Sequence, residues 1–498
     1  NSLQVSFASP ADNMKNGMQF CGLGVPDLRG TTSISFDISD SFTPDQHGSS
    51  MAGGIRLRAE FDGSDVAKMV VTGPRDGRKR YGTPGDYTAA DMTLKVDRKL
   101  GVGSAEVDGT RVEFAVGSWS EWLPMPFKMS DKYTAYGITR FYPLEIGEQV
   151  RLHMSCMMFH AGDPYAPLSS PEGYSKELHE RHGLFRTIGW QYDTHALRQD
   201  RLDEDAFFKD IRIGMAFNEK LTLDELDRGD FDMLVSVWEA TDRVGHMYWR
   251  FRDPQHPMYD PVLAEQWADA LEESYRISDG IVGRVMEKLG PDDLLMVLSD
   301  HGFESWRRGF DANVWLEEQG YLKVANRQQS YLMGLDWANT KAFAVGLSSM
   351  YINVSGRSRV GVVSPMDTDN LIGEIREKLL TVRDTEKGTP VFSNIYTSKD
   401  FSGESIRNAP DISFGFDGLH QVAKSVAAGA VGTDMFEDNM DKWGGEHASS
   451  DVQRLPGIFF CNRAVEADDP NIVDLGVTAL GYLNADVPTD FEGRDLFA

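Results

Sequence analysis

Short apolar runs that end or begin at ionisable side chains are the feature that most limits how this chain can fold. From about residue 166 onward, apolar runs at 231–237, 294–298 and 457–460 alternate with helical stretches such as 263–289. Short apolar runs between long helices are typical of strands in a parallel sheet that helices cover on both faces. The sequence therefore predicts an α/β fold with a doubly wound, mainly parallel sheet.

The first third of the chain has a different pattern. Between about 31 and 165, apolar and polar residues alternate, as at 55–61 and 110–116, and Gly and Asp interrupt them, which predicts antiparallel strands. A chain of 498 residues is too long for one compact core, so more than one domain is expected. We predict a remnant of the N-terminal part of the core at 1–30, a β-rich insertion at 31–165 and an α/β metal-binding core at 166–498.

Each apolar run of the α/β region lies beside residue types that bind metals. An Asp and a His follow the first run and are four residues apart, so a helical turn would place them on one face. An adjacent Asp and His end the second run, and a His precedes the third. Because ligands in open α/β sheets bind where the carboxyl ends of strands meet, these side chains should converge on one cleft. The predicted metal ligands are Asp242, His246, Asp300, His301 and His447.

Each motif also has an interpretation without a metal. An Asp and a His four residues apart are common on a helix surface, and a lone His is common in a Gly-rich loop. Asp300 and His301 differ, because two ionisable groups at a buried strand end need partners. Three such motifs in one region favour a metal site over coincidence. Carboxylates together with imidazoles suit zinc, manganese or iron better than calcium, which prefers oxygen ligands, and zinc is the first expectation.

Three further residues are candidates for contact with substrate. His256 lies between prolines beyond the first motif, where a role in a turn is the alternative. Arg307 and Arg308 follow the Asp-His motif and can contact phosphate, although a solvated pair at the start of a helix is equally consistent with the sequence.

Charge and cysteine content limit the partners and the compartment. A net charge of −27 opposes binding to nucleic-acid polymers. It does not oppose a small phosphoester, because bound divalent cations reverse the potential inside a site. No apolar run approaches the roughly 18 residues of a membrane-spanning helix. Three dispersed cysteines slightly favour a cytoplasmic location, and the absence of an initiator Met predicts that the sequence begins inside a longer chain.

Taken together, the motifs resemble the type I phosphodiesterase/nucleotide pyrophosphatase family of the alkaline phosphatase superfamily. They read Thr-Asp-Arg-Val-Gly-His at 241–246, Ser-Asp-His-Gly-Phe at 299–303 and Gly-Glu-His-Ala-Ser-Ser at 445–450, with further similar segments at 24–30, 249–257, 351–357 and 409–412. The resemblance covers nearly the whole chain and is weakest in the β-rich insertion. It implies two divalent ions. Asp242, His246 and His447 would hold one, and Asp300 and His301 would hold the other together with an Asp and a Ser or Thr nucleophile.

The resemblance also implies where that nucleophile lies. In the family, the segment that matches 24–30 normally follows both the nucleophile and the additional Asp, so both are expected upstream of residue 1. Three protein ligands are usual for a catalytic zinc site, whereas two leave the second site short. Thr31, Thr32 and Ser33 are local alternatives, but they enter the β-rich stretch. This chain alone is therefore expected to be inactive.

The expected activity is metal-dependent hydrolysis of a phosphodiester or pyrophosphate bond in a small phosphoester, with nucleotides among the candidate substrates. The resemblance implies a covalent phospho-enzyme intermediate on the nucleophile. Five ligands do not separate this activity from that of a phosphomonoesterase, phosphonate hydrolase, sulfatase or phosphomutase of the same superfamily. A non-catalytic metal-binding relative is the alternative from a different class.

Overall fold

The structure is a computed structural model that describes residues 3–6, 17–20, 25–30, 34–41, 54–76, 78–80, 85–401, 403, 406 and 408–498. Thr31, Thr32 and Ser33 lie outside the described residues. The chain divides into two compact units: Asn1–Arg243 with Ile277–Lys288, and Val244–Arg276 with Leu289–Ala498. The boundary passes through helices α4 (Ala240–Arg252) and α6 (Ala270–Met286), so each of these helices is continuous across it.

Most strand pairs of the first unit are antiparallel. In the meander of β5 to β8, every second residue of β6 faces the core, as the alternating sequence predicts. Asp108 and Gly109 join β7 to β8 with φ of 47° and 78°, the backbone that a tight hairpin turn requires. The strands of this meander are β5 (Val66–Arg75), β6 (Tyr87–Asp97), β7 (Val102–Val107) and β8 (Thr110–Ala115).

Two further sheets complete this β-rich part. One has the order β11-β12-β3-β4 and the other β13-β10-β9. Their strands are β3 (Phe36–Ser39), β4 (Ile55–Arg58), β9 (Leu123–Lys128), β10 (Thr134–Thr139), β11 (Phe141–Ile146), β12 (Val150–Met154) and β13 (Met158–Phe159). The described residues from Phe36 to Phe159 form strands and no helix. The predicted domain boundaries at 30 and 165 stay a prediction.

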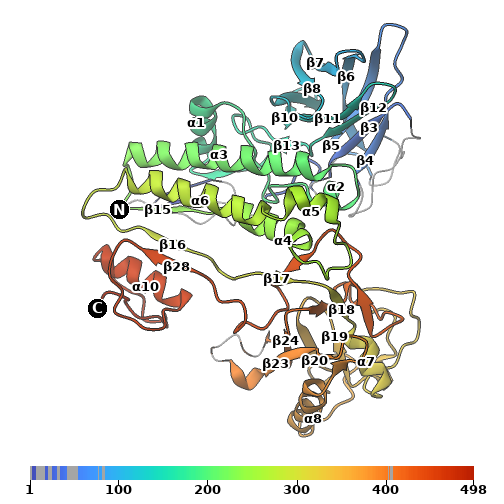
Figure 1. Ribbon diagram of the computed structural model, residues 1–498, viewed down its shortest axis with the longest axis vertical. Helices are drawn as coiled ribbons and strands as arrows, with labels where there is room; N and C mark the ends of the chain where they lie inside the picture. Colours follow the sequence, from blue (N-terminus) through green and yellow to red (C-terminus); the bar gives the residue numbers. More distant parts are fainter. Residues whose placement is uncertain are drawn as a thin grey trace. The chain divides into compact units, whose positions relative to one another are not determined.

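The rest of the first unit is mixed. The sheet β14-β2-β1-β15 contains the parallel pairs β1–β2 and β1–β15. The long helix α3 is capped by Asp203, whose side chain accepts a hydrogen bond from the Ala206 backbone, and ends at left-handed Gly229. Figure 1 shows α3 beside α6, to which ion pairs from Arg284 and Lys288 join it. The elements are β1 (Leu3–Ser6), β2 (Gly17–Phe20), β14 (Ser169–Ser170), α1 (Gly173–His182), α2 (Thr194–Arg198), α3 (Glu204–Arg228) and β15 (Met233–Ser236).

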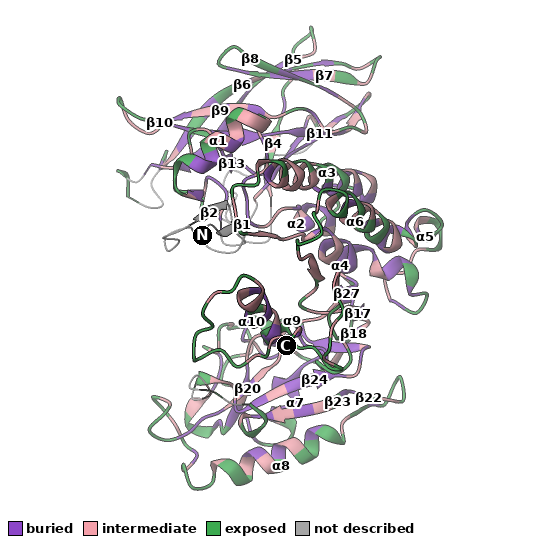
Figure 2. Cartoon of the chain, turned by 90° about the vertical axis from the view of Figure 1, so that its left-hand side faces the viewer, coloured by how far each residue is buried: buried purple, intermediate pink, exposed green. Residues whose placement is uncertain are grey.

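A second hydrophobic core lies in the second unit, around the antiparallel sheet β19-β20-β24-β23. Helix α8 packs on this core through Ile372, Ile375 and Leu379, whose spacing puts them on one face, and Figure 2 shows its buried and exposed residues alternating. The elements of this core are α7 (Ala312–Glu318), β19 (Ala342–Ala344), β20 (Ser349–Ile352), α8 (Thr368–Leu380), β23 (Phe392–Thr397) and β24 (Ile412–Phe416).

Several short strand pairs surround the predicted metal motifs. β16 pairs with β28, β17 with β27, and β18 lies between β25 and β26. Their bounds are β16 (Met296–Leu298), β17 (Glu304–Ser305), β18 (Arg308–Phe310), β25 (His420–Val422), β26 (Phe436–Asp438), β27 (Gly445–Glu446) and β28 (Phe459–Cys461). The other elements of this unit are α5 (Pro261–Trp267), η1 (Trp337–Asn339), β21 (Arg383–Asp384), β22 (Thr389–Pro390), η2 (Ser398–Asp400), α9 (Lys424–Ala427) and α10 (Ile472–Tyr482).

The fold is mixed α/β, but the described residues do not form one doubly wound, mainly parallel sheet. Most strand pairs are antiparallel, including β16 with β28, the two strands beside the second and third motifs. β15, beside the first motif, lies in a different sheet. These three apolar strands are also only partly buried. A short apolar run therefore indicated a strand without determining its direction or its neighbours. No helix among the described residues is long and apolar enough to span a membrane.

Candidate metal centre

Helix α4 carries the first two predicted ligands. Its first turn contains Asp242, where the partial positive charge of the helix N-terminus favours a carboxylate. His246 follows one turn later, on the same face. The His246 side chain is almost fully buried, with 2% of its surface exposed, whereas the Asp242 side chain is 25% exposed. His246 therefore lies inside the protein, whereas Asp242 is open to solvent.

Two glycines let the third ligand reach this helix. A Cβ atom on Gly445 would lie 2.5 Å from the carbonyl oxygen of Gly245, and one on Gly245 would lie 2.9 Å from the Phe303 ring. The absence of a side chain at Gly445 lets strand β27 approach helix α4, and its absence at Gly245 leaves room for the Phe303 ring beside that helix. His447 follows two residues after Gly445 and is held beside His246, with 5.1 Å between their ring centroids.

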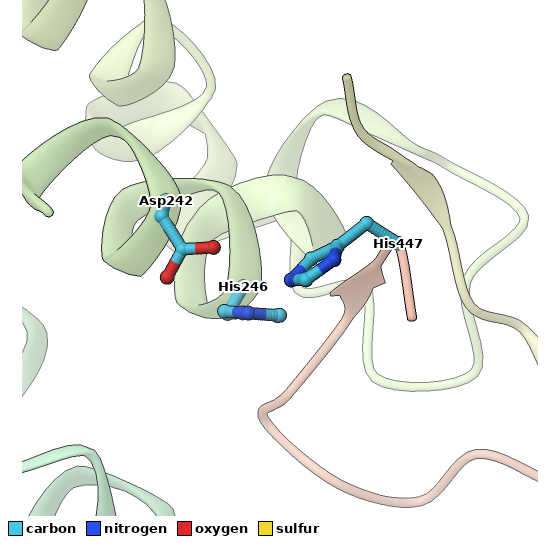
Figure 3. Close-up of side chains that lie close together, drawn as sticks. All are labelled: Asp242, His246 and His447. Carbon is cyan, nitrogen blue, oxygen red and sulfur yellow. The ribbon is translucent and has the colours of Figure 1, made fainter. Parts of the chain in front are cut away.

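The three side chains point toward one another (Figure 3). Asp242, His246 and His447 each offer a ligand atom, and these atoms lie within 4.8 Å of one another. Among the described residues, this is the group of three or more such side chains that could hold a metal ion. One carboxylate with two imidazoles is a donor set that fits a catalytic zinc site, which has three protein ligands and an open position. The residues present therefore fit a divalent ion.

Neighbouring groups orient these ligands. The His246 ring bonds through Nδ1 to the carbonyl oxygen of Gly445 at 2.8 Å, which favours the tautomer that carries its proton on Nδ1. That tautomer presents the Nε2 lone pair to a metal, as is usual for ligating histidines. Arg243 donates to the Asp242 carboxylate at 2.8 Å, and its guanidinium also lies 3.5 Å from Glu239. Burial raises the pKa of Glu239 to about 7, although Arg243 acts in the opposite direction.

The second predicted pair has only one member at this cluster. The His301 ring stacks on that of His447, with 3.5 Å between centroids and 8° between planes. Asp300 lies 3.5 Å from the His301 ring, but its side chain is 76% exposed and is not part of the three-ligand group. Ligation of a second ion by Asp300 and His301 stays a prediction.

The comparison with known families agrees with this chemistry. The pattern described as type I phosphodiesterase / nucleotide pyrophosphatase matches residues 139–417, more than half of the chain. The chain belongs to this family. Four of the five predicted ligands lie inside the matched residues, whereas His447 lies beyond them. No curated protein and no solved structure matches the chain. The family is one of hydrolases that act on small phosphoesters, so this phosphodiesterase-family chain is assigned to that broad class.

His256, Arg307 and Arg308 were predicted to contact substrate. In this phosphodiesterase-family chain their side chains contact other residues of the protein. His256 is 3% exposed, its Nδ1 accepts a hydrogen bond from the Met258 backbone, and burial lowers its pKa to about 4. Arg307 forms a two-pronged ion pair with Asp253, at 2.6 and 2.7 Å. Arg308 is buried against three carboxylates, Asp384, Glu386 and Asp438, at 2.6–3.0 Å. These contacts support structural roles, and contact with substrate stays a prediction.

Sequence reasoning missed the residues that surround the ligands. The ring of Trp443 packs on that of His246 with 3.8 Å between centroids, and the Phe303 ring meets His246 at 4.7 Å. Glu446 precedes His447 directly, so the Gly-Gly-Glu-His motif was the available signal for it. No spacing pattern pointed to Trp443, because its contact with His246 joins positions 197 residues apart, from 246 to 443.

Proposed function

We propose that this protein hydrolyses phosphodiester or pyrophosphate bonds with the help of a divalent ion held by Asp242, His246 and His447. The observation that supports this most is the convergence of three ligand atoms within 4.8 Å in a chain of the type I phosphodiesterase/nucleotide pyrophosphatase family. A bound divalent ion polarises a phosphoryl oxygen and lowers the pKa of a bound water or hydroxyl. Zinc fits the donor set best, with manganese and iron as alternatives.

The surrounding residues prepare the site for this chemistry. Gly445 holds the His246 ring through Nδ1, so that Nε2 is the nitrogen directed to a metal. Arg243 bonds Asp242 and keeps this carboxylate oriented at the N-terminus of α4. The 25% exposure of Asp242 leaves the cluster open on one side, where a small phosphoester can approach. A nucleotide is the substrate class that we favour, from the family description.

Two ions of unequal affinity are part of the proposal. Three ligands hold the first, while Asp300 and His301 beside it supply two for the second. An ion bound by fewer protein ligands should bind more weakly, because water fills the remaining positions. Calorimetric titration of the purified chain with zinc should resolve one tight event and a much weaker second one.

Variants of single ligands test the first site. Asp242→Ala and His246→Ala should each abolish the tight event. His179→Ala, in α1 and outside the cluster, should leave it unchanged. Tight binding that survives His246→Ala would refute the proposed ligand set.

A substrate panel tests the reaction, and it is run on a protein that carries the expected Ser or Thr nucleophile together with this site. Hydrolysis of bis(p-nitrophenyl) phosphate or of a nucleotide pyrophosphate, abolished by a chelator, restored by zinc and lost in His246→Ala, would support the proposal. Preference for a phosphomonoester, a phosphonate or a sulfate ester would assign a different activity of the superfamily. Tight zinc binding with no turnover of any of these would favour a non-catalytic metal-binding protein.

A further inference from the structure

Strand β27 and the loop before it are attached to His246 at several points. The Gly444 backbone N–H donates to the His246 carbonyl at 2.8 Å, and the Gly445 carbonyl bonds His246 Nδ1 at 2.8 Å. The Trp443 ring covers the face of the same imidazole. The 443–445 segment is therefore bonded to both the backbone and the side chain of one ligand, and it leads directly to another, His447.

One carboxylate joins the two ends of this segment. Glu446 accepts a hydrogen bond on Oε2 from Trp443 Nε1 at 3.0 Å. Its Oε1 accepts from the backbone N–H groups of His447 at 2.9 Å and Ala448 at 3.1 Å. The Glu446 side chain is only 13% exposed, so solvent competes weakly for these bonds. One oxygen thus fixes the ring that packs on His246, and the other fixes the turn that carries His447.

The backbone around Trp443 is anchored independently of Glu446. Asn439 donates through Nδ2 to the carbonyls of Trp443 at 2.8 Å and Trp306 at 2.9 Å, and Asp441 accepts from the Trp443 backbone N–H at 3.0 Å. Loss of the Glu446 bond should therefore release the orientation of the Trp443 ring without unfolding the loop.

We propose that Glu446 is a positioning residue that sets the relative orientation of the two imidazole ligands, His246 through Trp443 and His447 through its backbone. This role rests on the metal centre proposed above. Outer groups that orient metal ligands typically contribute about 10–100-fold in metal affinity. Glu446 Oε1 also lies 3.9 Å from His447 Nε2, and Glu446 should therefore control the affinity and the geometry of the bound ion from outside the three-ligand group.

Two substitutions separate this role from general stability. In Glu446→Gln the single remaining oxygen can serve the His447 turn or the Trp443 N–H, but not both, and the NH₂ group then faces a second donor. Trp443→Phe removes the indole N–H and keeps an aromatic ring against His246. Glu377→Gln, on the exposed side of α8, is the matched control.

The experiment measures zinc affinity by calorimetry, the visible spectrum of the Co²⁺-loaded chain, and the thermal unfolding of the metal-free protein. Glu446→Gln and Trp443→Phe should each lower zinc affinity about tenfold and shift the Co²⁺ bands. The double variant should lose less than the product of the two single losses, because both substitutions break one bond. Glu377→Gln should match the wild type.

The possible results distinguish the inference from the function on which it rests. Affinity and Co²⁺ spectrum unchanged in Glu446→Gln would overturn the positioning role while the metal centre stands. If the losses of zinc affinity in the two single variants multiply fully in the double variant, Glu446 does not orient His246 through Trp443. If Glu446→Gln lowers the thermal stability of the metal-free protein without changing its zinc affinity, Glu446 has a structural role only. A wild-type chain that binds neither Zn²⁺ nor Co²⁺ would overturn the metal centre and this role together.

Discussion

His246 is held by three kinds of contact at once: a backbone acceptor at Nδ1, an indole ring on one face and the edge of Phe303. A side chain so constrained loses little further freedom when it binds a metal, which favours affinity. His153, in β12, shows the opposite case. It is fully buried, and within the described part of the chain neither of its ring nitrogens has a hydrogen-bond partner. These two histidines should therefore respond differently to acid and to substitution.

His153 should make the first unit sensitive to acid. Burial lowers its pKa from 6.5 to about 4, although Asp193 acts in the opposite direction. The unfolded chain then takes up a proton near pH 6.5, before the folded chain does, so stability falls as the pH drops from 6.5 toward 4. The contribution is at most about 1.4 kcal/mol per pH unit. His153→Met should flatten the pH dependence of urea unfolding in this window.

Met154→Leu, the neighbouring core position in β12, is the control, because it changes packing without removing a titrating group. A pH dependence that is the same in His153→Met and the wild type would show that this histidine does not titrate as its burial requires.

At the scale of elements, the packing of the Phe303 ring against α4 supports the metal centre. A Cβ atom on Gly245 would lie 2.9–3.0 Å from three atoms of the Phe303 ring, which itself packs against His246 and His447. Gly245→Ala should therefore displace that ring, cost roughly 1–3 kcal/mol through overpacking and weaken zinc binding. Chemical denaturation and calorimetry on the same variant measure both effects.

Gly283→Ala is the matched helical substitution, because a Cβ atom there meets nothing within 4 Å. It should stabilise the protein by about 0.5–1 kcal/mol through the better helix propensity of Ala and leave zinc affinity unchanged. If Gly245→Ala behaved like Gly283→Ala, the Phe303 ring beside α4 would not be what holds His246 and His447 in position.

The sequence predicted some elements better than others. Alternation and the Asp108-Gly109 turn were sufficient for the antiparallel meander, because both signals are local. The spacing of Asp242 and His246 was sufficient for one helical face for the same reason. The direction of β16 and β28 was predicted wrongly: a mainly parallel sheet was expected and the two strands pair antiparallel, since a short apolar run is compatible with either direction. Trp443 was missed because its contact with His246 leaves no mark on residue spacing.

At the scale of the whole molecule, the ligands are spread widely along the chain. Asp242 and His246 lie inside the residues that match the type I phosphodiesterase family, and His447 lies 30 residues beyond the end of that match at 417. Asp242 and His246 lie in the single helix α4, so these two ligands keep their spacing. The central claim is therefore that His447 joins this helix in one metal site.

X-ray absorption at the zinc edge, on chain loaded with one equivalent of zinc, tests that claim most directly. We expect two imidazole ligands at about 2.0–2.1 Å and oxygen donors at about 2.0–2.2 Å, with one imidazole lost in His447→Ala. A sulfur ligand at about 2.3 Å, or a spectrum that His447→Ala leaves unchanged, would contradict it.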